Sequence, residues 1–132
     1  MTTDEIQQII DYAYPKIQAY YGKGELPIPP VELHVDIYAR LSGDPEARGE
    51  ASKSSKAEYD DKTNEIYIYY PNIKDEEDLL RSLVHEYTHY KQDHSLFQKY
   101  RDMYDYDDPK NKIEAEAKKA EEDWYLFSQS EI

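Results

Sequence analysis

Residues 75–89 read DEEDLLRSLVHEYTH, and this stretch decides both the central helix and the candidate chemistry of the chain. Asp75 is a suitable N-cap, and the three acidic residues after it suit the positive end of a helix dipole. The apolar residues that follow recur at helical spacing, namely Leu79, Leu80, Leu83, Val84 and Tyr87. The pattern predicts a long amphipathic helix that buries this stripe.

The same helix carries two histidines at the edge of its apolar stripe. His85 and His89 are four residues apart, so they share one helix face and can coordinate one metal ion. Glu86 lies one residue further round, where it can reach a water molecule on the open side of that ion. Chance would supply this H-E-x-x-H pattern in about 1% of chains of this composition, so the surrounding sequence must decide its meaning.

Composition restricts what kind of metal site the chain can hold. The 132 residues suit one hydrophobic core, so we expect residues 1–132 to form a single domain, with many of the 15 tyrosines in that core. The absence of cysteine excludes disulfides, thiolate zinc ligands and cysteine nucleophiles. Any metal must therefore be bound by histidine and carboxylate side chains.

The charge and hydropathy of the chain limit its partners. A formal charge of −13 argues against nucleic acids and anionic membranes, and it suits metal ions or basic peptides, although solubility alone explains it equally well. No segment approaches the roughly 18 apolar residues of a membrane span, and the N-terminal residues lack the features of a signal peptide. We therefore expect a cytoplasmic protein, with a monomer favoured.

The N-terminal segment predicts a helix. Thr2 and Glu5 have the spacing of a capping box, and apolar residues follow at helical spacing. Pro15 is expected to kink or restart this helix, and Gly22 and Gly24 end it.

Two regions in the middle of the chain have the patterns of strands. Residues 31–37 alternate between apolar and polar side chains, which places His34 on the polar face of a strand. Residues 57–59 and 66–70 flank a short polar segment and predict a β-hairpin. Residues 41–56 are small and polar, and they predict a long surface loop between the two regions.

Two further helices are predicted after the H-E-x-x-H stretch. The first covers about residues 96–104 and leads into an acidic loop at residues 105–109. The last helix has apolar residues on one side, namely Ile113, Ala117, Ala120, Trp124 and Phe127. The predicted fold class is therefore α+β, with helices packed on a small twisted sheet of about three to four strands.

Catalytic zinc usually has three protein ligands and one open position, so the two histidines need a third ligand. His94 is nine residues from His85, which rotates it by about half a turn on a continuous helix and points it away. The order of a strand, the histidine-bearing helix, a loop and a helix bearing Glu114 resembles the gluzincins, in which a glutamate on a second helix completes the zinc site. The closest resemblance is to minigluzincins and to phage- or ImmA-type metallopeptidases, over about residues 57–124. It implies a small zincin-like domain.

The resemblance implies Glu114 as the third ligand, because Glu114 precedes Ala117 by three residues, as the family's glutamate precedes a small residue. Helical periodicity favours the alternative, Glu116, which lies nearer the apolar stripe. The family often has Asp or Asn four residues after the ligand glutamate, where it holds a ligating histidine. Lys118 occupies that position here, so we expect the support to come from another carboxylate or a backbone carbonyl, or the site to bind metal less tightly.

The resemblance further implies a zinc-dependent peptidase that acts on peptides or unfolded proteins, with Zn²⁺ as cofactor. Its implied ligands are His85, His89 and Glu114. Glu86 is implied as the general base that takes a proton from the attacking water. Three tyrosines remain open as donors to the developing oxyanion, namely Tyr87, Tyr104 and Tyr106. A substrate is expected to bind as an extended strand beside a sheet edge near residues 54–59.

Two alternative functions remain open at the level of sequence. In the first, the same fold binds zinc but is latent, with tyrosines or the C-terminal segment filling the cleft. In the second, His85 and His89 are ordinary polar helix residues of an acidic interaction module that binds no metal.

Overall fold

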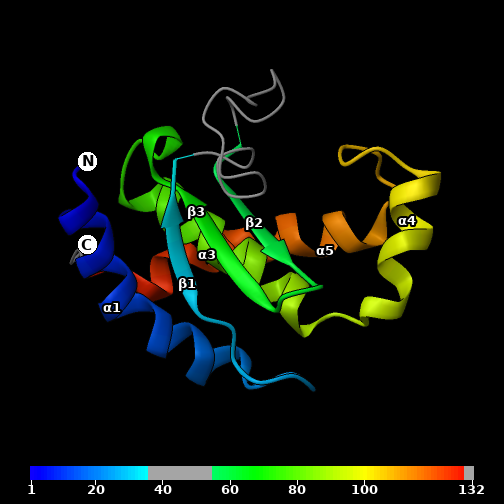
Figure 1. The fold of residues 1–132 in the computed structure, drawn as a ribbon, viewed down its shortest axis with the longest axis horizontal. Coiled ribbons are helices and arrows are strands. Elements are labelled where there is room, and N and C mark those ends of the chain that lie inside the picture. The colour runs from blue at the N-terminus through cyan, green and yellow to red at the C-terminus, as the bar shows by residue number, and fades with distance from the viewer. Residues whose placement is uncertain (36–54, 130–132) are drawn as a thin grey trace.

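The computed structural model describes residues 1–35 and 55–129 (Figure 1). Within these ranges the chain forms four α-helices and a three-stranded mixed sheet, which confirms the predicted α+β class. The helices are α1 Thr3–Tyr21, α3 Glu76–Lys91, α4 Phe97–Met103 and α5 Lys112–Ala120, and the strands are β1 Val31–His34, β2 Ala57–Asp60 and β3 Glu65–Tyr69. The 3-10 segments are η2 Tyr70–Asn72, η3 His94–Leu96 and η4 Glu121–Phe127.

The sheet has the strand order β1-β3-β2. β1 runs parallel to β3, and β2 runs antiparallel to it, as the predicted hairpin requires. Val31 of β1 and Tyr59 of β2 face Ile66 of β3 from its two sides. β2 is thus an edge strand in the described part of the sheet. β1 ends at His34, and Val35 forms a bend, so the strand predicted to residue 37 is shorter by at least one residue. Residues 36–37 and most of the predicted loop at 41–56 lie outside the described residues.

The hairpin turn is anchored to the segment that precedes β1. Asn64 adopts a left-handed conformation, with φ 57°, which asparagine tolerates better than most residues. The Tyr59 hydroxyl donates to Asn64 Oδ1 at 2.6 Å, and Asn64 Nδ2 donates to the Pro27 carbonyl at 2.8 Å. These bonds fix the end of β2 relative to the rest of the sheet.

The central helix, α3, begins as the sequence predicts. The Asp75 side chain accepts a hydrogen bond from the Asp78 backbone N–H at 2.8 Å, which caps the helix. The predicted apolar stripe is fully buried, from Leu79 to Tyr87. One flank of α3 therefore packs into the core, and the histidines lie beside that flank.

The N-terminal helix, α1, rules out one of the two effects predicted for Pro15. The Thr2–Glu5 capping box is present, but the helix continues without interruption from Thr3 to Tyr21 and does not restart at Pro15. Pro15 is exposed, while Ile10 and Ile17 on either side of it are buried against the core. Burial of that face compensates for the hydrogen bond that proline cannot donate.

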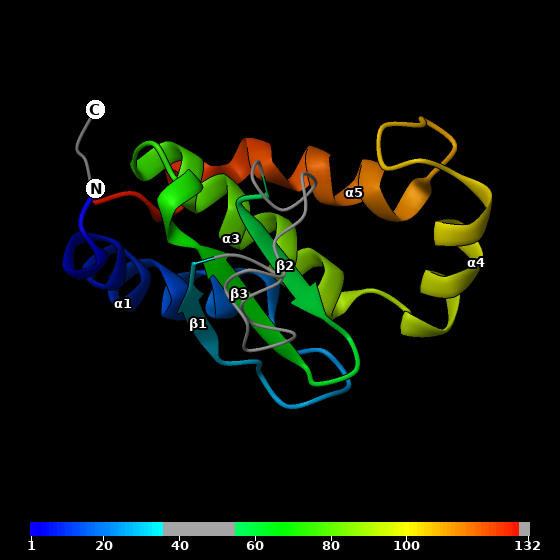
Figure 2. The ribbon, with the colours of Figure 1, turned by 45° about the horizontal axis from the view of Figure 1, so that its top comes forward.

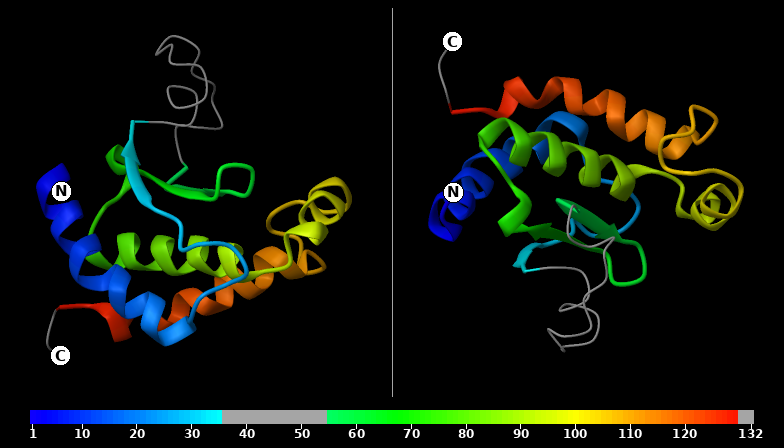
Figure 3. Two further views of the ribbon diagram at one scale, coloured as in Figure 1. Left: turned by 60° about the horizontal axis from the view of Figure 1, so that its bottom comes forward. Right: turned by 90° about the horizontal axis from the view of Figure 1, so that it is seen from above.

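α3 lies in the middle of the molecule, between the sheet on one side and α5 with η4 on the other (Figures 2 and 3). α1 packs against α3 and η4, and α4 projects beyond the C-terminal end of α3 (Figure 1). Buried residues of the sheet, α1, α3 and η4 form one hydrophobic cluster. One face of α3 is therefore bordered by β2 along one edge and by α5 along the other.

The core is rich in tyrosine, as the composition predicts. Three buried tyrosine hydroxyls donate to backbone carbonyls of the segment between α1 and β1: Tyr14 to Pro29, Tyr87 to Gly22, and Tyr90 to Leu26. These bonds satisfy both partners while the rings fill the core. Among residues 1–35 and 55–129, no helix is long and apolar enough to cross a membrane.

Candidate metal site

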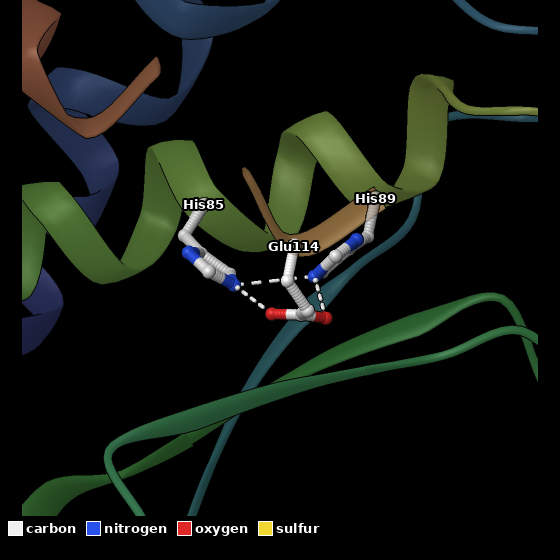
Figure 4. A group of neighbouring side chains, drawn as sticks. All are labelled: His85, His89 and Glu114. Carbon is white, nitrogen blue, oxygen red and sulfur yellow. Dashed lines mark hydrogen bonds and ion pairs between the residues drawn. The ribbon is translucent and has the colours of Figure 1, made fainter. Parts of the chain in front are cut away.

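Three side chains predicted as metal ligands converge between α3 and α5 (Figure 4). The Glu114 carboxylate lies between the two imidazoles, with Oε1 3.1 Å from His85 Nε2 and Oε2 3.0 Å from His89 Nε2. The two Nε2 atoms are 3.1 Å apart. All three residues are largely shielded from solvent, with side chains 10 to 15% exposed.

This arrangement fits a divalent metal ion. Imidazole nitrogens and a carboxylate are ligands that zinc accepts, and ligands about 2.0–2.1 Å from a tetrahedral ion lie about 3.3 Å from one another. The separations of 3.0 to 3.1 Å between the candidate ligand atoms are close to that spacing. The group could therefore hold a metal ion.

The structure brings Glu114, and not Glu116, to the histidines. Asn111 caps α5 by accepting a hydrogen bond from the Glu114 backbone N–H at 3.3 Å, which fixes Glu114 in the first turn of the helix. Glu116 is exposed, and its carboxylate accepts a hydrogen bond from Gln92 Nε2 at 3.1 Å. Helical periodicity favoured Glu116, which was wrong, because the cluster lies beside the apolar stripe of α5 and not on that stripe.

Each histidine has a second partner on its other ring nitrogen. Glu121 Oε2 lies 2.7 Å from His85 Nδ1, and Gln92 Oε1 lies 2.7 Å from His89 Nδ1. Lys118, at the position where the resembled family has Asp or Asn, instead pairs with Asp107 at 2.6 Å. The expected replacement carboxylate is thus Glu121.

Gln92 and Glu121 are part of the site but were not among the residues predicted from the sequence. Gln92 follows His89 by three residues and therefore shares its helix face, a spacing that could have revealed it. Glu121 follows Glu114 by seven residues, or about two helical turns, which also returns it to the same side.

The remaining candidates from the sequence take different positions. His94 is not part of the cluster: its Nε2 lies 3.1 Å from the Tyr90 carbonyl, and its ring packs against Phe97. The Tyr87 hydroxyl donates to the Gly22 carbonyl at 2.6 Å, so this tyrosine belongs to the core. Tyr104 and Tyr106 line the space in front of the cluster.

A cleft of about 970 Å³ opens beside the candidate ligands. One wall is β2 with the hairpin turn, and the other is α4 with residues 104–106. The second wall is aromatic and consists of Phe97, Tyr100, Tyr104 and Tyr106. At one place the two walls are joined, because Arg101 Nη2 of α4 pairs with Asp61 Oδ1 of the turn at 3.1 Å.

The charges within the cluster stabilise one another. Burial alone would lower the pKa of His85, but the hydrogen bonds to Glu114 and Glu121 raise it to about 10. Burial alone would raise the pKa of Glu114, but the bonds to His85 and His89 lower it to about 2. Without a metal, the cluster therefore holds protons that a metal ion must displace.

Glu86 lies beside this cluster and is almost completely buried. Burial raises the pKa of its carboxyl group, against the opposing effects of His85, His89 and a hydrogen bond from the Tyr59 backbone. A buried carboxyl group with a raised pKa at the edge of a cleft is suited to accept and return a proton.

Comparisons with models of known families, with curated proteins and with solved structures find no match for this chain. Fold and side chains together define an α+β protein with a cluster of two histidines and one glutamate that could hold a metal ion.

Proposed function

We propose that the protein is a zinc-dependent peptidase of the gluzincin type, with His85, His89 and Glu114 as the metal ligands and Glu86 as the general base. The observation that carries this proposal is the convergence of the three candidate ligands, within 4.8 Å of one another, beside a buried glutamate and an open cleft. A chance H-E-x-x-H sequence does not by itself place a carboxylate from another helix between its two imidazoles.

A divalent ion in this cluster would act as a Lewis acid that polarises a peptide carbonyl and makes water reactive near neutral pH. The chain supplies the remaining functions. Glu86 accepts the proton of the attacking water and passes it to the leaving nitrogen, a transfer that its raised pKa favours. Tyr104 and Tyr106 are the candidate donors to the developing oxyanion, because both line the cleft.

β2 is the proposed binding edge for the substrate backbone. Tyr69 N–H donates to the Lys56 carbonyl at 2.9 Å, so Lys56 forms a hydrogen-bonded pair with β3. In an antiparallel ladder such pairs alternate, which directs the backbone groups of Ala57 and the Tyr59 carbonyl towards the open edge, while the Tyr59 N–H donates to Glu86. An extended peptide could pair with this edge without regard to its sequence and lie between β2 and the aromatic wall of the cleft.

Hydrolysis of an unfolded protein tests this function. Zinc-loaded wild type is expected to cleave denatured casein, and Glu86→Gln is expected to bind the same amount of zinc and show no cleavage above background. Glu122→Gln, a change of another glutamate outside the cleft, is the matched control and should cleave as wild type does. Equal hydrolysis by Glu86→Gln and wild type would refute the assignment of Glu86.

One observation favours a latent form of the same enzyme as a second candidate. The hairpin contacts the proposed base through the Tyr59 backbone and is tied to α4 by the Asp61–Arg101 pair. In a latent enzyme these contacts keep the cleft too narrow for a peptide. Zinc binding without hydrolysis by wild type, together with hydrolysis by Arg101→Ala, would support the latent form.

A further inference from the structure

The side chain of Gln92 connects the two helices that supply the candidate ligands. Gln92 is the C-cap residue of α3, and its backbone N–H donates to the carbonyls of Thr88 and His89. Its amide oxygen lies 2.7 Å from His89 Nδ1. Its amide nitrogen donates to the Ile113 carbonyl at 2.9 Å and to Glu116 Oε1 at 3.1 Å, both on α5.

The contacts with α5 fix which way the Gln92 amide faces. A backbone carbonyl and an ionised carboxylate can only accept hydrogen bonds, so the group that faces Ile113 and Glu116 must be the amide NH₂. The amide oxygen is then the atom that faces His89. The alternative orientation would place oxygen against two acceptors and NH₂ against the imidazole.

This orientation determines the state of His89. An amide oxygen is an acceptor, so His89 Nδ1 must carry the hydrogen of their 2.7 Å bond. In the neutral imidazole, which is the form that binds metals, the lone pair then lies on Nε2. Nε2 is the atom that faces Glu114 and His85.

We propose that Gln92 is a positioning residue of the metal site: its amide, oriented by Ile113 and Glu116, fixes His89 as the Nδ1–H tautomer and ties it to the helix that carries Glu114. Ile113 directly precedes Glu114, so one side chain sets both the tautomer of one ligand and the distance to another. His85 depends on a different element, because its partner Glu121 lies in η4. This inference rests on the metal site of the proposed function but not on hydrolysis.

Replacement of Gln92 by Met tests the inference, because Met has a similar shape and lacks the amide. Gln92→Met is expected to bind zinc about 10- to 100-fold more weakly than wild type, measured by competition with a chelating indicator. The matched control is Gln98→Met on α4, where an exposed glutamine donates a hydrogen bond to Asp102 of the same helix, and its zinc affinity should equal that of wild type. The melting temperature of the metal-free proteins shows whether Gln92→Met is folded.

The His89 ring proton gives a readout that a merely structural role would not change. In zinc-loaded wild type labelled with ¹⁵N-histidine, NMR should show a slowly exchanging Nδ1–H signal for His89, and Gln92→Met should lose it. Gln92→Glu keeps one oxygen on His89 and should retain the signal, whereas its second oxygen faces the Ile113 carbonyl and the Glu116 carboxylate, so its tie to α5 is lost.

Three outcomes would overturn the inference. Unchanged zinc affinity in Gln92→Met removes the positioning role, and an Nδ1–H signal that persists in Gln92→Met or disappears in Gln92→Glu removes the contact with His89 as its cause. Wild type that binds no zinc refutes both this inference and the proposed function. Zinc binding with the predicted variant effects but without any hydrolysis refutes the peptidase alone.

Discussion

The candidate site has one side formed with α5 and another formed with α4, and different kinds of contact hold the two sides together. On the side of α5, the candidate ligands form a closed network in which every ring nitrogen of His85 and His89 has a partner within 3.1 Å. On the side of α4, the cleft walls meet through the exposed Arg101–Asp61 pair and aromatic side chains. Folding thus fixes the ligand side, whereas the cleft side depends on weaker surface contacts.

The largest expected effect comes from breaking the ligand side at Glu114. Glu114→Ala should weaken zinc binding by more than about 100-fold, because it removes one of three protein ligands. Glu116→Ala is the comparison variant on the same helix and should change zinc affinity by less than about tenfold, since Glu116 accepts a hydrogen bond from the Gln92 amide and does not itself belong to the candidate ligands. Titration with a chelating indicator measures both, and equal affinities for Glu114→Ala and wild type would contradict the ligand assignment.

The closed network also predicts a dependence on pH. The pKa of His85 is raised from 6.5 to about 10 and that of His89 is also raised, so zinc must displace protons from both in the metal-free protein. Zinc affinity should therefore rise from about pH 6.5 towards pH 10, by about tenfold per pH unit for each proton displaced.

The stability of the metal-free protein should change in the opposite direction. A raised histidine pKa stabilises the fold fully below the unfolded value of 6.5, and this contribution is lost as the pH rises through about 10. The lowered pKa of Glu114 acts at the acid end: its contribution is present above 4.5 and is lost as the pH falls through about 2. Thermal melts of the metal-free protein measure this, and a melting temperature that rises between pH 6.5 and 10 would contradict the network.

The smallest expected effect on stability lies on the cleft side. Arg101→Ala removes one exposed ion pair and should lower the free energy of unfolding by less than about 1 kcal/mol. If the hairpin and α4 restrict the cleft, hydrolysis of a peptide should increase in this variant while zinc affinity stays unchanged. Arg81→Ala, which removes the exposed Glu77–Arg81 pair on α3, is the control for loss of a surface charge. A decrease in hydrolysis with Arg101→Ala would show that the pair supports the cleft instead of closing it.

Local sequence signals predicted most of the fold. The Thr2–Glu5 capping box, the Asp75 N-cap and the hairpin were correct because short-range hydrogen bonds and turn preferences determine them. Of the two effects predicted for Pro15, a kink or a restart, the restart does not occur, since burial of the surrounding helix face outweighs one missing hydrogen bond. Tertiary packing decided this point.

The candidate site was predictable only in part. His85, Glu86 and His89 follow from spacing along one helix, whereas the choice of Glu114 over Glu116 depends on how α5 lies against α3. Gln92 and Glu121 share helix faces with His89 and Glu114, but this spacing alone does not tell which histidine nitrogen each would contact. Their roles follow from the order in which α3, α5 and η4 pack.

X-ray absorption at the zinc edge of the one-to-one complex tests the central claim most directly. The account predicts one zinc per chain with two imidazoles, one carboxylate and one further oxygen as ligands. Spectra without two imidazoles, or a purified protein that retains no zinc at neutral pH, would contradict it.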